Sequence, residues 1–232
     1  MTERKPKAAR YAPGLENLDQ IVRAAEKVLV EQGHAALTLR RIADECGLKV
    51  GNLSYYFPTK QLLVKALLDR LMISHQGDLG LITMRDEADA EAMLTSVMFY
   101  WMRENQPRHT SRLYVELWSM ANNDPYIRQE VDKGYERGKQ RNKRIFAAVN
   151  PKLTEEELDA LAMLAISVRE GLMVFANEDR PEVKLMPLMA SYTVQALLQL
   201  ARNPDQAALR ALEARWRSDE LINQAGRKAA RL

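Results

Sequence analysis

Cysteine is nearly absent from this 232-residue chain, and other reactive groups are sparse. The single Cys46 excludes any internal disulfide, which fits a reducing compartment. His34, His75 and His109 are scattered without a metal-ligand spacing. Gly-rich phosphate loops, His-Glu-x-x-His and Gly-x-Ser-x-Gly signatures are missing. We therefore expect a protein that is not an enzyme and has no metal site and no cofactor.

Long hydrophobic runs are missing as well. The first ten residues are charged and lack the apolar segment of a secretory signal. The purest apolar run, residues 160–168, is too short to span a bilayer. A composition that is 47% hydrophobic and 28% charged is typical of a globular protein. We expect a cytoplasmic protein without a membrane partner, with its small basic excess at the two ends of the chain.

Strand patterns are also absent, since no segment alternates convincingly between apolar and polar residues. Apolar residues recur instead at helical spacing, interrupted by Gly, Pro and capping residues. A polar stretch at 77–89 separates a first set of helices from a second. The sequence predicts an all-α protein with helices near 17–32, 38–46, 50–56, 59–71, 94–106, 113–118, 125–149, 154–176 and 185–202, and a basic one after 203.

The most informative segment lies between Thr38 and Lys60. Thr38 is a good N-cap for a short helix that Gly47 ends, and a second short helix follows at 50–56. Thr59 then caps the start of a third. Two short helices joined by a tight turn form a helix-turn-helix, in which the second helix enters the major groove of DNA. The spacing predicts a DNA-binding helix-turn-helix between Thr38 and Lys60, which we call the reader, with Leu53 in its core.

The outer face of this reader carries hydrogen-bond donors. The Thr38 hydroxyl and helix start suit a phosphate, and either Arg40 or Arg41 is expected to face DNA. Asn52 is suited to adenine, and the Tyr hydroxyls to phosphates. Lys60 lies at the unfavourable positive end of its helix, which an external phosphate would relieve. The predicted DNA-binding residues are Thr38, Arg40, Lys49, Val50, Gly51, Asn52, Ser54, Tyr55, Tyr56 and Lys60.

Residues 17–63 resemble the DNA-binding domain of the tetracycline-repressor (TetR, AcrR-like) family of bacterial transcriptional regulators. The resemblance is carried by Ala24, Gly33, Thr38, Ile42, Ala43, Gly47, Gly51, Leu53, Tyr56, Phe57, Lys60 and Leu62. It implies a cytoplasmic, nucleoid-associated homodimer that binds a palindromic operator, with phosphate roles for Thr38, Tyr56 and Lys60. Two positions depart from the family pattern. Lys49 replaces the usual Ser or Thr cap of the second helix, and Ser54 replaces a usual Tyr.

The pattern of the sequence, taken together with the resemblance, predicts a division into four parts, of which the last extends beyond the usual family picture. These are a flexible basic arm at 1–15, a helix-turn-helix domain at 16–75, a ligand-binding and dimerisation domain at 76–202, and an extra basic helix at 203–232. Large soft side chains in the second domain suit a small apolar or amphipathic ligand. The predicted pocket residues are Met98, Trp101, Met102, Tyr114, Trp118, Met163, Glu170 and Met173. Arg169 is expected on a different face of the helix from Glu170. Either residue could fix a polar group of the ligand or form an ion pair at an interface, and the ion pair is the favoured role.

Two apolar seams are expected to form the dimer interface by this resemblance. They comprise Leu161, Ala165, Val168 and Leu172 on one helix, and Leu188, Met189, Tyr192 and Ala196 on the next. The sequence favours a ligand-responsive repressor. A regulator controlled by a protein partner, or by no ligand, is the alternative, and an all-α enzyme is a remote one.

Overall fold

The computed structural model describes residues 12–85 and 89–218, without the side chains of 12–15, 74–78 and 83–85. Across these ranges the regular elements are helices only, as predicted. They are α1 (Ala12–Gln32), α2 (Leu39–Cys46), α3 (Val50–Tyr56), α4 (Lys60–Arg85), α5 (Ala90–Glu104), α6 (Arg108–Asn123), α7 (Pro125–Val149), α8 (Glu155–Phe175), the 3-10 turn η2 (Pro181–Leu185), α9 (Met186–Arg202) and α10 (Gln206–Ser218).

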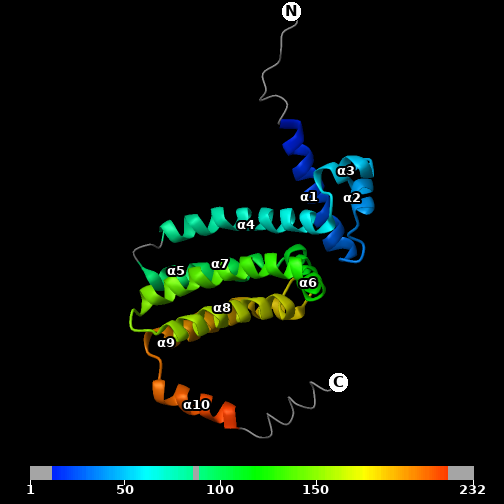
Figure 1. Ribbon diagram of the computed structural model, residues 1–232. Helices are drawn as coiled ribbons and strands as arrows, with labels where there is room; N and C mark the ends of the chain where they lie inside the picture. Colours follow the sequence, from blue (N-terminus) through cyan, green and yellow to red (C-terminus); the bar gives the residue numbers. More distant parts are fainter. Residues whose placement is uncertain (1–11, 86–88, 219–232) are drawn as a thin grey trace, which may run out of the picture.

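The helices form a small unit at one end of a larger layered body (Figure 1). Helices α1, α2 and α3 pack around the fully buried Ile42 and Leu53, with the start of α4 closing the unit through Leu63 and Leu67. The same core continues into α6 through Leu117. The three-helix unit is thus anchored on the body by shared apolar packing as well as by the chain itself.

Local capping explains where the short helices stop and start. Thr38 Oγ1 accepts a hydrogen bond from the Arg41 backbone N–H, and Gly47 ends α2 with φ of 67°. This left-handed backbone conformation costs glycine little and other residues about 1 kcal/mol. Thr59 Oγ1 accepts from the Leu62 N–H and begins α4. These ends are the predicted ones.

Helix α4 departs from the prediction because it continues through most of the stretch expected to be a polar break. It runs to Arg85 without interruption at residue 75, although Gly77 and Gly80 each weaken a helix by about 1 kcal/mol. Leu79 is buried in the core of the body, and Ile82 packs against that core. Tertiary packing therefore extends the helix beyond its local signals.

The body is a layered bundle in which α4 crosses above α5 and α7, while α8 and α9 lie below (Figure 1). Its core is filled by Leu94, Val97, Phe146 and Ala165, all with 0% exposure. The predicted capping box at the start of α8 is present, with Thr154 and Glu157 capping each other. Helix α10 extends away from the bundle, and its residues are exposed along its length.

Candidate DNA-binding site and interior cavity

The α2–α3 pair presents a polar edge on top of a buried core. Leu53 is fully buried while its helical neighbours Lys49, Gly51 and Asn52 are exposed. Val50 is 42% exposed and Tyr55 is 80% exposed, so both are accessible to a partner. A Cβ added at Gly51 would meet no atom within 4 Å, so this backbone is open to close approach. The edge has the shape and donors of a recognition helix.

Helix α3 begins without a side-chain cap, as its sequence predicts. Lys49 occupies the N-cap position in extended conformation and makes no capping hydrogen bond. The first N–H groups of α3 therefore stay available to an external acceptor. Ser54 is half-buried on the same short helix.

The two arginines of α2 have different surroundings. Arg41 donates through Nε to Gln32 at 3.0 Å and through Nη2 to Glu45 at 2.7 Å. Glu45 also pairs with Lys27, and the two cations lower the pKa of its carboxyl. Arg40 is exposed and forms no ion pair with the described residues. Of the two alternatives left open by the sequence, the geometry favours Arg40 as the one free to reach DNA.

Tyr56 is half in the core and half at the surface. Its ring packs against the core of the three-helix unit and meets the Tyr55 ring edge-on, with 5.4 Å between ring centroids. Its hydroxyl accepts a hydrogen bond from Asn17 Nδ2 at 3.2 Å. The hydroxyl keeps its own hydrogen for donation, so the intramolecular contact leaves room for a phosphate.

Lys60 has an internal partner that the sequence did not indicate. Its Nζ donates to the carbonyl oxygen of His34 at 3.1 Å, and partial burial lowers the pKa of its ammonium. The conflict with the positive helix end is thus eased by a carbonyl dipole at the end of the turn after α1. An ammonium has three donors, so two remain for a phosphate. Thr38, which caps α2, remains exposed beside this turn.

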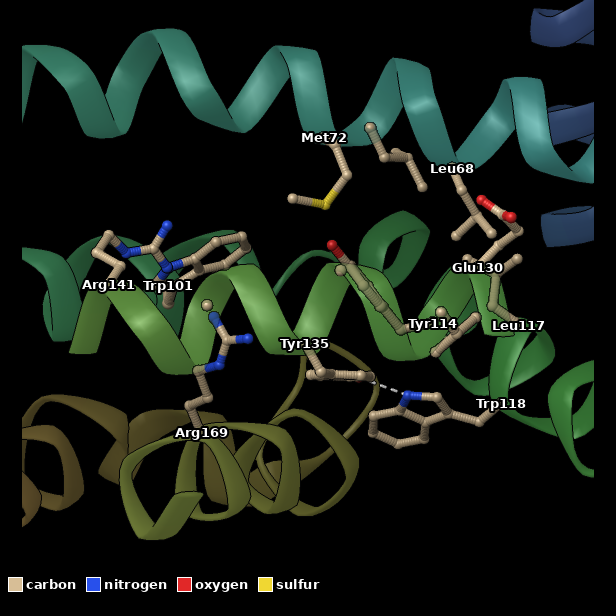
Figure 2. Close-up of a pocket in the computed structure, with 14 residues that line it drawn as sticks. Leu68, Met72, Trp101, Tyr114, Leu117, Trp118, Glu130, Tyr135, Arg141 and Arg169 are labelled. Carbon is tan, nitrogen blue, oxygen red and sulfur yellow. Dashed lines mark hydrogen bonds between the residues drawn. The ribbon is translucent and has the colours of Figure 1, made fainter. Parts of the chain in front are cut away.

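A separate cavity lies inside the body, where α4, α5, α6, α7 and α8 meet (Figure 2). About 60 Å³ of it is open to the centre of a water-sized sphere, several times the 10–15 Å³ that one water needs. Its walls are mostly apolar and aromatic. They comprise Leu68, Leu71, Met72, Trp101, Tyr114, Leu117, Trp118, Glu130, Val131, Gly134, Tyr135, Gly138, Arg141 and Arg169.

Two guanidinium groups meet one indole ring at one end of this cavity (Figure 2). Arg169 Cζ lies 4.2 Å from the centroid of Trp101, and Arg141 Cζ lies 5.7 Å from it. Arg169 is 7% exposed and pairs with Glu170 at 3.0 Å. Burial, with a smaller contribution from the neighbouring positive charge of Arg169, lowers the pKa of Arg141 to about 10.

Two tyrosines line the middle of the cavity. Burial raises the pKa of Tyr114 to about 12 and also raises the pKa of Tyr135, so both hydroxyls are neutral at physiological pH. Tyr135 accepts a hydrogen bond from Trp118 Nε1 at 2.6 Å (Figure 2). Its O–H remains as a donor toward a third group.

The structure separates the predicted pocket residues into three groups. Trp101, Tyr114 and Trp118 line the interior cavity. Met163 and Glu170 line a shallow groove on the far side of Trp118 and Tyr135. Met98, Met102 and Met173 are buried and do not line the interior cavity, because their side of each helix faces the core of the body. The prediction that they line this pocket is therefore corrected.

Helices α4 and α7 supply cavity residues that the sequence analysis missed. Leu68 and Met72 come from α4, in a segment that the sequence places in the helix-turn-helix domain. Gly134, Tyr135, Gly138 and Arg141 come from α7 at spacings of one and two helical turns. This helical spacing is present in the sequence, but the polar residues between these positions make the face that lines the cavity hard to recognise. Arg169, expected on another face from Glu170, lines the cavity. It forms its ion pair with Glu170 of the same chain and not with a residue across a dimer interface.

The structure corrects part of the predicted dimer interface. Leu161 and Ala165 are buried in the chain's own core, so they are not available to a partner. Val168, Leu172 and Met189 are half-buried, and Leu172 and Met189 pack against that core. Leu188, Tyr192 and Ala196 of α9 are exposed as expected. The exposed apolar residues of α8 are instead Met163, Leu164 and Phe175.

Direct contacts connect the reader with the helices around the cavity. Glu116 of α6 accepts hydrogen bonds from the His34 backbone N–H at 2.8 Å and pairs with His34 Nδ1 at 2.6 Å. His109 of α6 meets Glu26 of α1 at 2.6 Å. Gln61 of α4 donates to Asp124, the N-cap of α7, at 2.9 Å. Helices α4 and α6 thus line the cavity and also contact the unit formed by α1, α2 and α3.

The described part of the chain has neither a metal-binding cluster nor a membrane-spanning helix. No group of three or more His, Cys, Asp or Glu side chains in the described ranges is placed to hold a metal ion. No described helix has the length and apolar character needed to span a bilayer.

Comparison with known proteins agrees with this geometry. Residues 21–67 match the family model of bacterial regulatory proteins, tetR family. No curated protein matches the chain. The fold is similar to that of a transcriptional regulator from Saccharomonospora viridis in complex with choline, with TM-score 0.61, 18% identity, and coverage of 80% of this chain and 95% of that one.

Two other solved structures have the same fold. One is the multidrug binding protein EbrR complexed with malachite green, with TM-score 0.62, 19% identity, and coverage of 80% of this chain and 98% of that one. The other is a TetR transcription regulator from Haloarcula marismortui, with TM-score 0.58, 21% identity, and coverage of 83% and 97%. The matched segment includes all of α2 and α3. Residues 21–67 therefore carry the N-terminal domain of bacterial regulatory proteins of the tetR family, and the chain as a whole shares its fold with solved transcriptional regulators.

Proposed function

We propose that the chain is a homodimeric, ligand-responsive repressor that reads a palindromic operator with α3. The observation that carries the proposal is the α2–α3 edge, where Leu53 is buried and Arg40, Lys49, Asn52 and Tyr55 are exposed. Arg40 and Lys49 are cations, and Asn52 is suited to adenine. Thr38, Tyr56 and Lys60 take the phosphates that fix the position of the helix.

Exposed apolar side chains on α8, η2 and α9 support dimerisation. Phe175 is 71% exposed, Tyr192 is 62% exposed, and Leu185 and Leu188 are each 53% exposed. Large apolar side chains gathered on neighbouring helices mark an interaction surface rather than a solvated face. Self-association through this surface gives two-fold symmetry, which places two α3 helices to read half-sites about 34–36 Å apart or a multiple of that distance.

The interior cavity supports control by a small ligand. A transcriptional regulator of this fold holds choline and a multidrug binding protein of this fold holds malachite green, so the fold accommodates small organic molecules. Here α4 carries Leu68 and Met72 of the cavity wall and starts at Lys60 beside the reader. A ligand that prefers one position of α4 changes the separation of the two α3 helices. Moving the equilibrium from 1:99 to 99:1 requires about 5.5 kcal/mol of differential affinity.

The experiment is selection of bound DNA from a random pool with the purified full chain, followed by footprinting. The proposal expects an inverted repeat and protection on one face of the duplex. An N52A variant should change the preferred bases, whereas Y56F should weaken binding about equally on all sequences. Failure to enrich any sequence, or enrichment of a site without symmetry, contradicts the proposal.

A further inference from the structure

The interior cavity has an imbalance of charge at its Trp101 end. Arg141 and Arg169 both reach the Trp101 ring there (Figure 2), and Glu170 supplies a carboxylate to Arg169 at 3.0 Å. Among the described side chains, Glu170 forms an ion pair with Arg169 alone. Arg141 forms no ion pair with the described side chains, and the charged groups that act most on it, Arg169 and Arg144, have its own sign. Two cations thus share one anion.

The polar atoms of this cluster are incompletely satisfied. Within the described part of the chain, the Nε atoms of Arg141 and Arg169 are buried and have no hydrogen-bond partner, and neither has Glu170 Oε2. Arg169 is more than nine-tenths buried. A buried charge is expensive unless it is paired and hydrogen-bonded, and a planar guanidinium matches a carboxylate through two parallel hydrogen bonds. The cluster therefore has room for one more anion.

The opposite end of the cavity carries a carboxylate that already has cationic partners, so it does not attract the same anion. Glu130 lies there and pairs with Lys133 at 2.7 Å and more loosely with Lys65 at 3.9 Å. Between the two ends, Met72, Leu117 and the aromatic rings present apolar surface. The cavity thus offers a cationic end and an apolar middle.

We propose that the ligand of this cavity is a small organic acid whose carboxylate lies between Arg141 and Arg169 and whose apolar body extends toward Met72 and Leu117. The proposal rests on the ligand-responsive function above and names its ligand class. Trp101 stacks beside the guanidinium groups and holds Arg169 in place. A cationic ligand such as choline is disfavoured at this end because both cavity-lining charges there are positive.

The test uses matched series of compounds that differ in charge but hardly in shape. Phenylacetate, phenylacetamide and 2-phenylethylamine form an aromatic series; octanoate, octanamide and octylamine form an aliphatic one. Binding to the full chain is measured by titration calorimetry, and operator binding is measured in the same preparations. We expect the acid of at least one series to bind at least about tenfold more tightly than its amide, the effect of one charge-assisted contact.

Two variants should move acid affinity in opposite directions. R141M removes one cation and should weaken acid binding at least about tenfold, while its unfolding midpoint stays the same or rises because an unpaired charge is lost. E170Q removes the anion that competes for Arg169 and should strengthen acid binding. R137M, an exposed arginine on the same helix, is the control and should leave acid binding unchanged. General damage to the fold would shift both test variants the same way.

Three outcomes overturn the inference. One is that amides or amines bind as tightly as the acids. Another is that R141M and R137M affect acid binding equally. The third is that none of the six compounds binds while the operator is still bound. This result rules out an organic acid as the ligand but does not contradict the proposed DNA-binding function. Loss of operator binding by the unmodified chain would instead defeat the proposed function.

Discussion

The contact between Glu116 and the turn after α1 gives the sharpest test of how the body holds the reader. Glu116 Oε2 is the acceptor for the His34 backbone N–H and contacts the His34 ring. Replacing it with alanine leaves the partly buried amide without an acceptor, which costs about 1–3 kcal/mol. The exposed His34 ring contact adds at most about 1 kcal/mol, since exposed pairs contribute little.

The assay is amide hydrogen exchange followed by mass spectrometry. A local loss of about 1–3 kcal/mol should speed exchange of residues 33–37 by about 5- to 150-fold. The hydrogen bonds that close this turn, Ala36 N–H to Gly33 and Leu37 N–H to His34, open with it. D132A, which removes an exposed carboxylate of α7, should leave this segment unchanged. Unchanged exchange of residues 33–37 in E116A would refute the idea that α6 holds the reader through this contact.

Further predictions concern the turn, the capping box and the apolar surface. Gly47→Ala should destabilise the chain by about 1 kcal/mol in urea denaturation, because φ is positive and the added Cβ meets no atom within 4 Å; an unchanged midpoint would contradict this. Thr154→Ala should cost about 0.5–2 kcal/mol. The backbone N–H of Thr154 lowers the pKa of the Glu157 carboxyl, so the stabilisation by Glu157 is present near neutral pH and should be lost on acidification, whereas an acid-insensitive difference in stability between wild type and E157Q would count against it. Tyr192→Asp should weaken self-association in analytical ultracentrifugation while the helical circular dichroism is retained; an unaltered dimer would place the interface elsewhere.

The reader was predictable because its limits depend on local chemistry. Thr38 supplies a cap, Gly47 supplies a left-handed turn, and Thr59 begins the next helix; each acts within four residues of itself. The uncapped start of α3 at Lys49 follows from the same rules. Such signals do not depend on the rest of the fold, so sequence and structure agree there within a residue.

The body was less predictable because its helices are apolar on more than one side. In α8, both the row containing Leu161 and Ala165 and the row containing Leu164 and Phe175 are apolar, and only tertiary packing decides which is buried. The extension of α4 through Gly80 depends on the burial of Leu79. Arg141 joins the cavity because of how α7 packs against α5 and α8, which no local signal specifies.

Photocrosslinking from α3 to the selected operator tests the central claim most directly. A photoreactive phenylalanine derivative placed at Tyr55, which is 80% exposed, should crosslink to the DNA. The same residue placed at Tyr192, which is 62% exposed on α9, is the matched control and should crosslink only to a second copy of the chain. Crosslinks to DNA from position 192 and none from position 55 would contradict the assignment of α3 as the element that reads the duplex.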